Sequence, residues 1–228
     1  MILSYLRTIM NVTEYISNHL QPLRVKDHIE DVQHRFQQSL VTHLPLVENK
    51  ILLGCFSEED IQVLHLASEE IGTQIHLLHS FFADEKATIL ELLKIFADND
   101  ANIIPVLNQE QHYIGYYELG DVLDIFSTTP FMIEKSETLI IEKKENDFSM
   151  TEANQIIEAN GGKVLGSYVS SKSQENVQIT LKIITKDLNE IMHTFRRYDY
   201  KIISIHENDI YLEDLRNRSE YLQKYLEM

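Results

Sequence analysis

Two stretches in the first half of the chain place apolar residues three and four positions apart, the spacing of one helical face. They are Ile29, Val32 and Phe36, and then Ile89, Leu92, Leu93 and Phe96. Each is followed by a short apolar run interrupted by proline, at 44–47 and 104–107, then by a polar turn and a second apolar run. Further helices are predicted from 58 to about 66 and from 119 to 126. The pattern therefore predicts helix, strand, strand and helix, twice in succession.

The two halves also repeat residue by residue. The recurring pairs, sixty or sixty-one positions apart, are Lys26 and Lys86, Ile29 and Ile89, Phe36 and Phe96, Pro45 and Pro105, Gly54 and Gly115, and Asp60 and Asp121. A match in the same order across a whole supersecondary unit indicates a duplicated module. Two equivalent halves that pack together create a cleft, and small ligands bind in such clefts. Residues 67–80 are predicted to form a helix that bridges the two repeats.

The pattern changes after Thr129 and Pro130. Four strands are predicted beyond this point, at 138–141, 164–169, 177–183 and 201–205. Ser149 and Asp187 each begin a capping box, with glutamate three residues later, so a helix is predicted after each. The order βαββαβ predicts a ferredoxin-like domain, an antiparallel sheet with two helices on one face. Leucines spaced in threes and fours predict a last helix over 209–228, packed on its own domain or on a partner subunit.

Composition limits the possible functions. The chain has 228 residues and a net charge of −16, from 36 acidic and 20 basic residues. Because it lacks a clustered Lys and Arg footprint, binding to nucleic acid is not expected. Cys55 is the only cysteine, so no intrachain disulfide can form, and its apolar surroundings predict a small buried residue. Since no apolar run approaches ~20 residues, we expect no membrane span and a cytoplasmic location.

The strongest local motif is the stretch GCFSEED at residues 54–60. Ser57 as helix N-cap, with Asp60 at the third helical position, would explain both residues without a ligand. A helix N-terminus also offers free N–H groups to an anion, so the same residues fit a nucleotide contact. Both interpretations remain open at this point.

At this motif the duplicated pattern resembles the CBS domain family, whose tandem pairs are called Bateman modules. The resemblance covers residues 12–128, with repeat one at about 12–66 and repeat two at about 76–128. It implies that Asp60 holds the ribose hydroxyls of an adenosine ligand and that Ser57 contacts its phosphate. The ligands it implies are AMP, ATP, adenosine or S-adenosylmethionine.

The second copy of the motif keeps Asp121 but places Glu118 where the family has a hydroxyl residue. A carboxylate about 4 Å from a phosphate costs roughly 4 kcal/mol at an effective dielectric near 20. Asp121 is therefore predicted to hold a ribose without a phosphate. Either the first site is preferred for a nucleotide, or the ligand is an uncharged, adenosine-like molecule. His43 lies where the family strand approaches the base, although a buried, hydrogen-bonded histidine is the preferred interpretation.

Neither a metal site nor a catalytic site is predicted. His76 and His79 lie three positions apart on the predicted bridging helix, but a clear third ligand is missing. The sequence contains no GxGxxG, P-loop, nucleophile elbow or HExxH motif. We therefore expect a protein that is not an enzyme.

Residues 137–208 are similar to the ACT family of small regulatory domains. Members that bind amino acids generally carry a glycine in the first strand-to-helix loop, but the loop at 145–149 has none. The resemblance therefore implies a dimerising or coupling role. The order of a CBS pair and an ACT-like domain resembles the small CBS–ACT proteins of acetoin-utilisation regulation.

These observations predict an α+β chain with a CBS pair, a ferredoxin-like, ACT-like domain and a C-terminal helix. The predicted function is that of a homodimeric, non-catalytic sensor of an adenine-containing metabolite, which couples binding to subunit arrangement or to an unidentified protein partner. The alternative is a degenerate CBS–ACT scaffold that has lost its ligand and acts through protein contacts.

Overall fold

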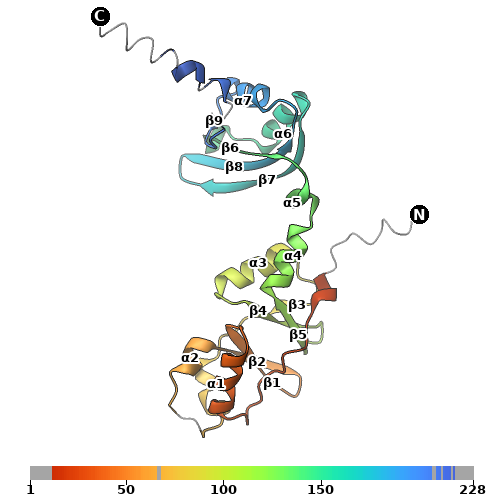
Figure 1. Cartoon of the computed structure of the whole chain (residues 1–228), viewed down its shortest axis with the longest axis vertical. Coiled ribbons are helices and arrows are strands. Elements are labelled where there is room, and N and C mark those ends of the chain that lie inside the picture. The colour runs from red at the N-terminus through yellow and green to blue at the C-terminus, as the bar shows by residue number, and fades with distance from the viewer. Residues whose placement is uncertain (1–11, 66–67, 207–208, 212, 217, 219–228) are drawn as a thin grey trace, which may run out of the picture. The chain divides into compact units, whose positions relative to one another are not determined.

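The computed structural model describes residues 12–65, 68–206, 209–211, 213–216 and 218. The chain divides into two compact units, residues 1–128 and residues 129–228, and each is described by itself (Figure 1).

The first unit contains two ten-residue helices that begin sixty positions apart, α1 (Ile29–Gln38) and α3 (Ile89–Asp98). Each buries the apolar face that its spacing predicts. Thr88 caps α3 in a reciprocal capping box with Glu91, whereas His28 offers α1 no side-chain cap. The capping box at Thr88 was not among the sequence predictions.

Each helix is followed by an antiparallel hairpin and a closing helix. The first repeat has β1 (His43–Glu48), β2 (Ile51–Ser57) and α2 (Glu58–Gln62). The second has β4 (Ile103–Leu107), β5 (Tyr113–Glu118) and α4 (Leu119–Ser127). The register shifts at equivalent places, between Leu46 and Val47 and between Val106 and Leu107. The predicted order of helix, strand, strand and helix is therefore present in both repeats, although α2 ends earlier than position 66.

The N-terminal segment of each repeat pairs with the hairpin of the other repeat. Ser17 and Tyr116 exchange two backbone hydrogen bonds of 2.8 and 2.9 Å. His79 and Cys55 exchange two more, both of 2.8 Å. The 3₁₀ helix η2 (Val12–Tyr15) lies before the first of these contacts, and β3 (Ala83–Asp84), parallel to β4, lies after the second. The two repeats are thus interlocked.

Gly54 and Gly115 make this interlocking possible. Their φ angles are +149° and +147°, a conformation that residues with a side chain rarely adopt. A Cβ on Gly54 would lie 2.9 Å from the Leu78 Cβ, and one on Gly115 would lie 2.5 Å from the Ser17 carbonyl oxygen. Both strands continue for three residues beyond these glycines.

The helix predicted over 67–80 is replaced by a shorter 3₁₀ helix, η3 (Ile71–Leu77). The backbone turns extended at Leu78, with φ −68° and ψ 127°. This change exposes the backbone of His79 for its pairing with Cys55, which a continuous helix would prevent. Consequently His76 and His79 do not share a helical face, as the sequence had suggested.

Each repeat has its own apolar core, and the core of the second repeat also includes a side chain from the first repeat. The first core is formed by Leu23, Ile29, Val32, Phe36, Leu44, Leu46, Phe56, Ile61 and Ile71. The second includes Leu92, Phe96, Ile104, Val106 and Tyr117, together with Cys55 from the first hairpin. Cys55 is fully buried, as expected for a small apolar residue.

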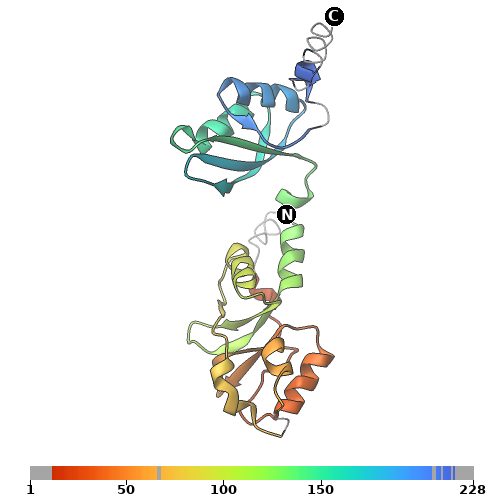
Figure 2. The same cartoon turned by 90° about the vertical axis from the view of Figure 1, so that its left-hand side faces the viewer.

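The second unit has the predicted βαββαβ order after a short helix, α5 (Pro130–Ile133). Its strands are β6 (Glu137–Lys144), β7 (Lys163–Lys172), β8 (Asn176–Ile184) and β9 (Lys201–Ile202), all paired antiparallel in the order β7-β8-β6-β9. The helices α6 (Met150–Ala159) and α7 (Leu188–Arg197) lie on one face of this sheet (Figures 1 and 2). A 3₁₀ turn, η4 (Glu145–Asp147), joins β6 to α6.

The start of α6 differs from the sequence analysis. Ser149 caps α6 by accepting from the Glu152 N–H at 3.3 Å, but the Glu152 carboxylate bonds to Lys143 and Tyr200 instead of completing a capping box. Most of the C-terminal helix predicted over 209–228 lies outside the described residues, including three of its four spaced leucines. Among the described residues, no helix is both long enough and apolar enough to span a lipid bilayer.

Candidate functional site

Ser57 and Asp60 are placed by the junction of β2 and α2. Ser57 is the last residue of the strand and the N-cap of the helix. Its Oγ accepts a hydrogen bond from the Asp60 N–H at 3.1 Å and donates one to Asp60 Oδ2 at 2.6 Å. The capping role predicted for Ser57 is therefore present.

The Asp60 carboxylate has a second partner, which the sequence analysis missed. His79 Nε2 donates to Asp60 Oδ2 at 2.9 Å. Hydrogen bonds from Ser57 and then from His79 lower the pKa of Asp60 below its ordinary value. Both bonds end on Oδ2, and no described residue donates to Oδ1, while 37% of the Asp60 side chain is exposed. One carboxylate oxygen thus remains available to a ligand.

His43 lies beside this pair. Its ring packs edge-on against the rings of His79 and Phe81, with centroids 5.5 and 5.2 Å apart. Thr42 Oγ1 is 2.9 Å from His43 Nδ1. Burial, and next the charge of His79, lowers the pKa of His43 to about 4, so its imidazole is neutral at pH 7. His43 is therefore buried and hydrogen-bonded.

Thr42 and Asn102 join the two repeats at equivalent positions. The Asn102 Oδ1 accepts from the Thr42 N–H at 2.9 Å and from its hydroxyl at 3.2 Å, and the Asn102 N–H donates to Thr42 Oγ1 at 3.0 Å. Asn102 Nδ2 also donates to the Leu40 carbonyl at 2.6 Å. The sixty-residue spacing was the only sequence signal for this pair.

Asp121 occupies the position in α4 that Asp60 has in α2, but its surroundings differ. Glu118 is the N-cap of α4, and its side chain makes no capping bond. Asp121 is half-buried and forms no hydrogen bond or ion pair with another described side chain. The structure therefore gathers Ser57, Asp60 and His43 around His79 and leaves Asp121 outside this cluster.

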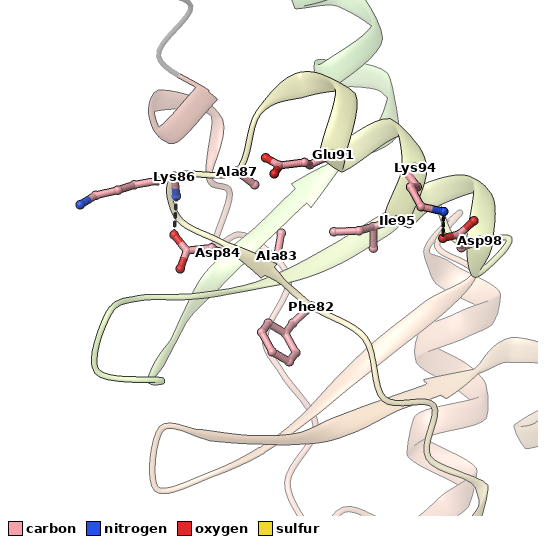
Figure 3. A pocket seen from close by; sticks show the side chains of 9 residues that line it. All are labelled: Phe82, Ala83, Asp84, Lys86, Ala87, Glu91, Lys94, Ile95 and Asp98. Atoms are coloured by element: carbon pink, nitrogen blue, oxygen red, sulfur yellow. Dashed lines mark hydrogen bonds and ion pairs between the residues drawn. The ribbon is translucent and has the colours of Figure 1, made fainter.

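The described residues of the first unit line at least two open grooves. The larger, of about 490 Å³, is lined by Phe82, Ala83, Asp84, Lys86, Ala87, Glu91, Lys94, Ile95 and Asp98 (Figure 3). The other, of about 400 Å³, is lined by Thr42, Leu93, Phe96, Ala97, Asp100, Ala101, Asn102 and Leu119. None of the four predicted site residues lines either groove. The second groove does include Thr42, which is bonded to His43.

The Cys55 thiol lies in the apolar core of the second repeat. Burial raises the pKa of the Cys55 thiol, which keeps it protonated and unreactive at neutral pH. Within the described part of the chain, no three His, Cys, Asp or Glu side chains are placed to hold a metal ion.

The second unit has a polar cluster at the start of α6. Lys143 Nζ is 2.7 Å from Glu152 Oε2, and the Tyr200 hydroxyl donates to the same oxygen at 2.8 Å. The ammonium group also lies 4.2 Å from the centre of the Tyr200 ring. The hydrogen bond from Lys143 is the largest cause of a lowered pKa for Glu152. Lys143, Glu152 and Tyr200 therefore meet one another's charge and hydrogen-bonding needs beside the loop at 145–149.

Solved structures similar to this chain include a CBS domain pair/ACT domain protein from Thermotoga maritima, 19% identical over 51% of this chain and 95% of that one, with a TM-score of 0.45. The CBS domains of a transcriptional regulator from Streptococcus pneumoniae are 17% identical over 51% of this chain and 98% of theirs, with a TM-score of 0.45. CBSX2 in complex with AMP is 16% identical over 50% of this chain and 93% of its own, with a TM-score of 0.43.

No protein of curated function matches the chain. The sequence model of the CBS domain family matches residues 76–128, which include α3, β4, β5 and α4. Residues 76–128 are therefore similar in sequence to the CBS domain family.

Proposed function

We propose that residues 12–128 form a tandem CBS pair that senses an adenine-containing metabolite, and that the chain is a non-catalytic regulatory protein. CBS domains are generally regulatory, and the second repeat matches that family. The first repeat supports the pair because its elements, the register shift in its hairpin and its glycine conformation correspond to those of the second.

The proposal rests on the exposure and the unfilled hydrogen-bonding capacity of the Asp60 carboxylate. Its side chain is 37% exposed, and its Oδ1 accepts no hydrogen bond from a described residue. A ribose diol can donate one hydroxyl to Oδ1 and a second to Oδ2, in place of His79. The lowered pKa of Asp60 keeps the group ionised and therefore an acceptor at neutral pH.

For the second unit we propose a ferredoxin-like, ACT-like fold that couples the sensor to dimer arrangement or to a protein partner. Its topology supports this fold. The polar cluster of Lys143, Glu152 and Tyr200 argues against an amino-acid ligand at this loop, because the charged groups there are already paired. The resemblance to acetoin-utilisation CBS–ACT regulators, the homodimer and the cytoplasmic location belong to the same proposal.

Isothermal titration of the full chain with AMP, ATP, adenosine and S-adenosylmethionine tests the sensor. We expect at least one to bind, Asp60→Ala to abolish that binding, and Asp121→Ala, the matched change in the other repeat, to leave the first site intact. Light scattering with and without the bound compound then tests the coupling. Equal behaviour of the wild type and Asp60→Ala towards all four would reject the site and favour the scaffold.

A further inference from the structure

The groove of about 490 Å³ lies between α3 and residues 82–87, which include β3 (Figure 3). Its apolar lining includes Phe82, whose side chain is 45% exposed, and Ile95, which points from α3 towards Ala83. Because β3 is the edge strand of its sheet, no described strand pairs with its outer side. A groove between a helix and an edge strand fits an extended peptide, since the strand offers backbone groups and the helix offers side-chain contacts.

The described part of the chain begins beside this groove. Val12 is buried in the same apolar cluster as Ala83, with 5% of its surface exposed. The Thr13 hydroxyl donates to the Glu85 carbonyl at 3.2 Å, and Glu85 belongs to the segment at 82–87 that lines one side of the groove. The residues that precede Val12 therefore leave the described structure next to the groove.

Residues 1–11 have the composition of a segment that binds to an apolar surface. They contain no acidic residue, and Arg7 is their only charged side chain at neutral pH, whereas 25% of the whole chain is charged. Most of the remaining positions are apolar: Met1, Ile2, Leu3, Tyr5, Leu6, Ile9 and Met10. Contact with the groove would remove part of this apolar surface from water.

The charge of the groove complements that of this segment. Its lining has three carboxylates against two ammonium groups. Lys94 is paired with Asp98 at 2.6 Å. Asp84 accepts the backbone N–H of Lys86 at 2.9 Å, and none of the described ion pairs involves its carboxylate. The groove therefore carries a surplus negative charge that attracts Arg7.

We propose that residues 1–11 bind as an extended segment in the groove between α3 and β3 of their own chain. Eleven extended residues reach about 36 Å, whereas the helix axis from Glu91 to Asp98 measures about 10 Å, so part of the segment is enough to fill the groove. The bound segment covers Phe82 and Ile95 and closes the groove to other peptides.

Cross-linking within the full chain tests the placement. A short bismaleimide is applied to Ser4→Cys/Lys94→Cys, which has one cysteine in the segment and one on the groove. The natural Cys55 is buried and does not compete. The matched control is Ser4→Cys/Leu123→Cys, because Leu123 is exposed on α4, which packs against η2, and does not line this groove. We expect the groove pair to cross-link within one chain about fivefold faster or more.

A peptide with the sequence of residues 1–11 tests the same groove from outside. Fluorescence anisotropy should show that it binds to a variant lacking residues 1–11. Its binding to the full chain should be about tenfold weaker or more, because the tethered segment competes at a high effective concentration. Phe82→Ala in the shortened variant should weaken peptide binding several-fold, whereas Leu123→Ala should leave it unchanged.

Three results would overturn the proposal. The first is equal cross-linking rates for the two cysteine pairs. The second is a groove pair that cross-links only between chains, which would give the groove to the segment of a second copy. The third is a peptide that binds equally to the full chain and the shortened variant, or equally to Phe82→Ala. All of these results are independent of nucleotide binding.

Discussion

The interlocking of the repeats predicts a large effect of replacing Gly115 with alanine. The new Cβ would lie 2.5 Å from the Ser17 carbonyl oxygen and 2.7 Å from Ile16 Cγ2. The φ of +147° adds backbone strain of about 1–3 kcal/mol for a residue with a side chain. Overpacking costs a further 1–3 kcal/mol, roughly, so Gly115→Ala should lower the free energy of unfolding by about 2–6 kcal/mol.

Gly120→Ala is the matched control in the same part of the chain. Gly120 lies in α4, and a Cβ there meets nothing within 4 Å. Alanine favours a helix over glycine by about 1 kcal/mol, so this variant should equal or exceed the wild type in stability. Hydrogen-exchange mass spectrometry in a urea series separates peptides of the first unit from those of the second. Equal protection of Gly115→Ala and the wild type would refute the close approach of the two segments.

Three further changes test other parts of the structure. Asn102→Ala removes the hydrogen bonds to Thr42 and Leu40 and should destabilise the first unit by about 2–3 kcal/mol in chemical denaturation; a change under about 0.5 kcal/mol contradicts the bridge. Lys143→Met leaves Glu152 without its cation and should lower the free energy of unfolding of the second unit by about 1–3 kcal/mol. Tyr200→Phe removes only one neutral donor and should lower it by less. The opposite order of the two variants in thermal unfolding would contradict this expectation. Because the pKa of Asp60 is lowered in the folded state, its ionised form stabilises the fold at pH values above its ordinary pKa of 3.8. This stabilisation is lost as the pH falls through the folded-state pKa. Asp60→Asn should therefore unfold below the wild-type temperature at pH 7, with a difference that shrinks towards pH 3; a constant difference across that range would count against the ionised pair.

Local structure was readable from the sequence because its signals are local. The apolar spacing of α1 and α3 and the N-caps of α6 and α7 depend on residues within three or four positions of one another. The internal repeat also showed which elements correspond, since it placed them sixty residues apart in the sequence. The resemblance to the CBS family is confirmed for residues 76–128.

Long-range contacts were not readable in the same way. The spacing marked Gly54 and Gly115 as equivalent, but not the segments that approach them, because Ser17 and Tyr116 are 99 positions apart. The partner of Asp60 was missed because His79 was placed on a predicted helix. The structure ends that helix at Leu77 and brings the His79 side chain to Asp60.

The most direct test is a crystal structure of the full chain grown with adenosine. The account predicts adenosine at the start of α2, with a ribose hydroxyl within hydrogen-bond distance of Asp60 Oδ1 and a second hydroxyl at Oδ2 in place of His79. Adenosine bound elsewhere, with Asp60 still held by His79 and its Oδ1 in contact only with water, would contradict the account.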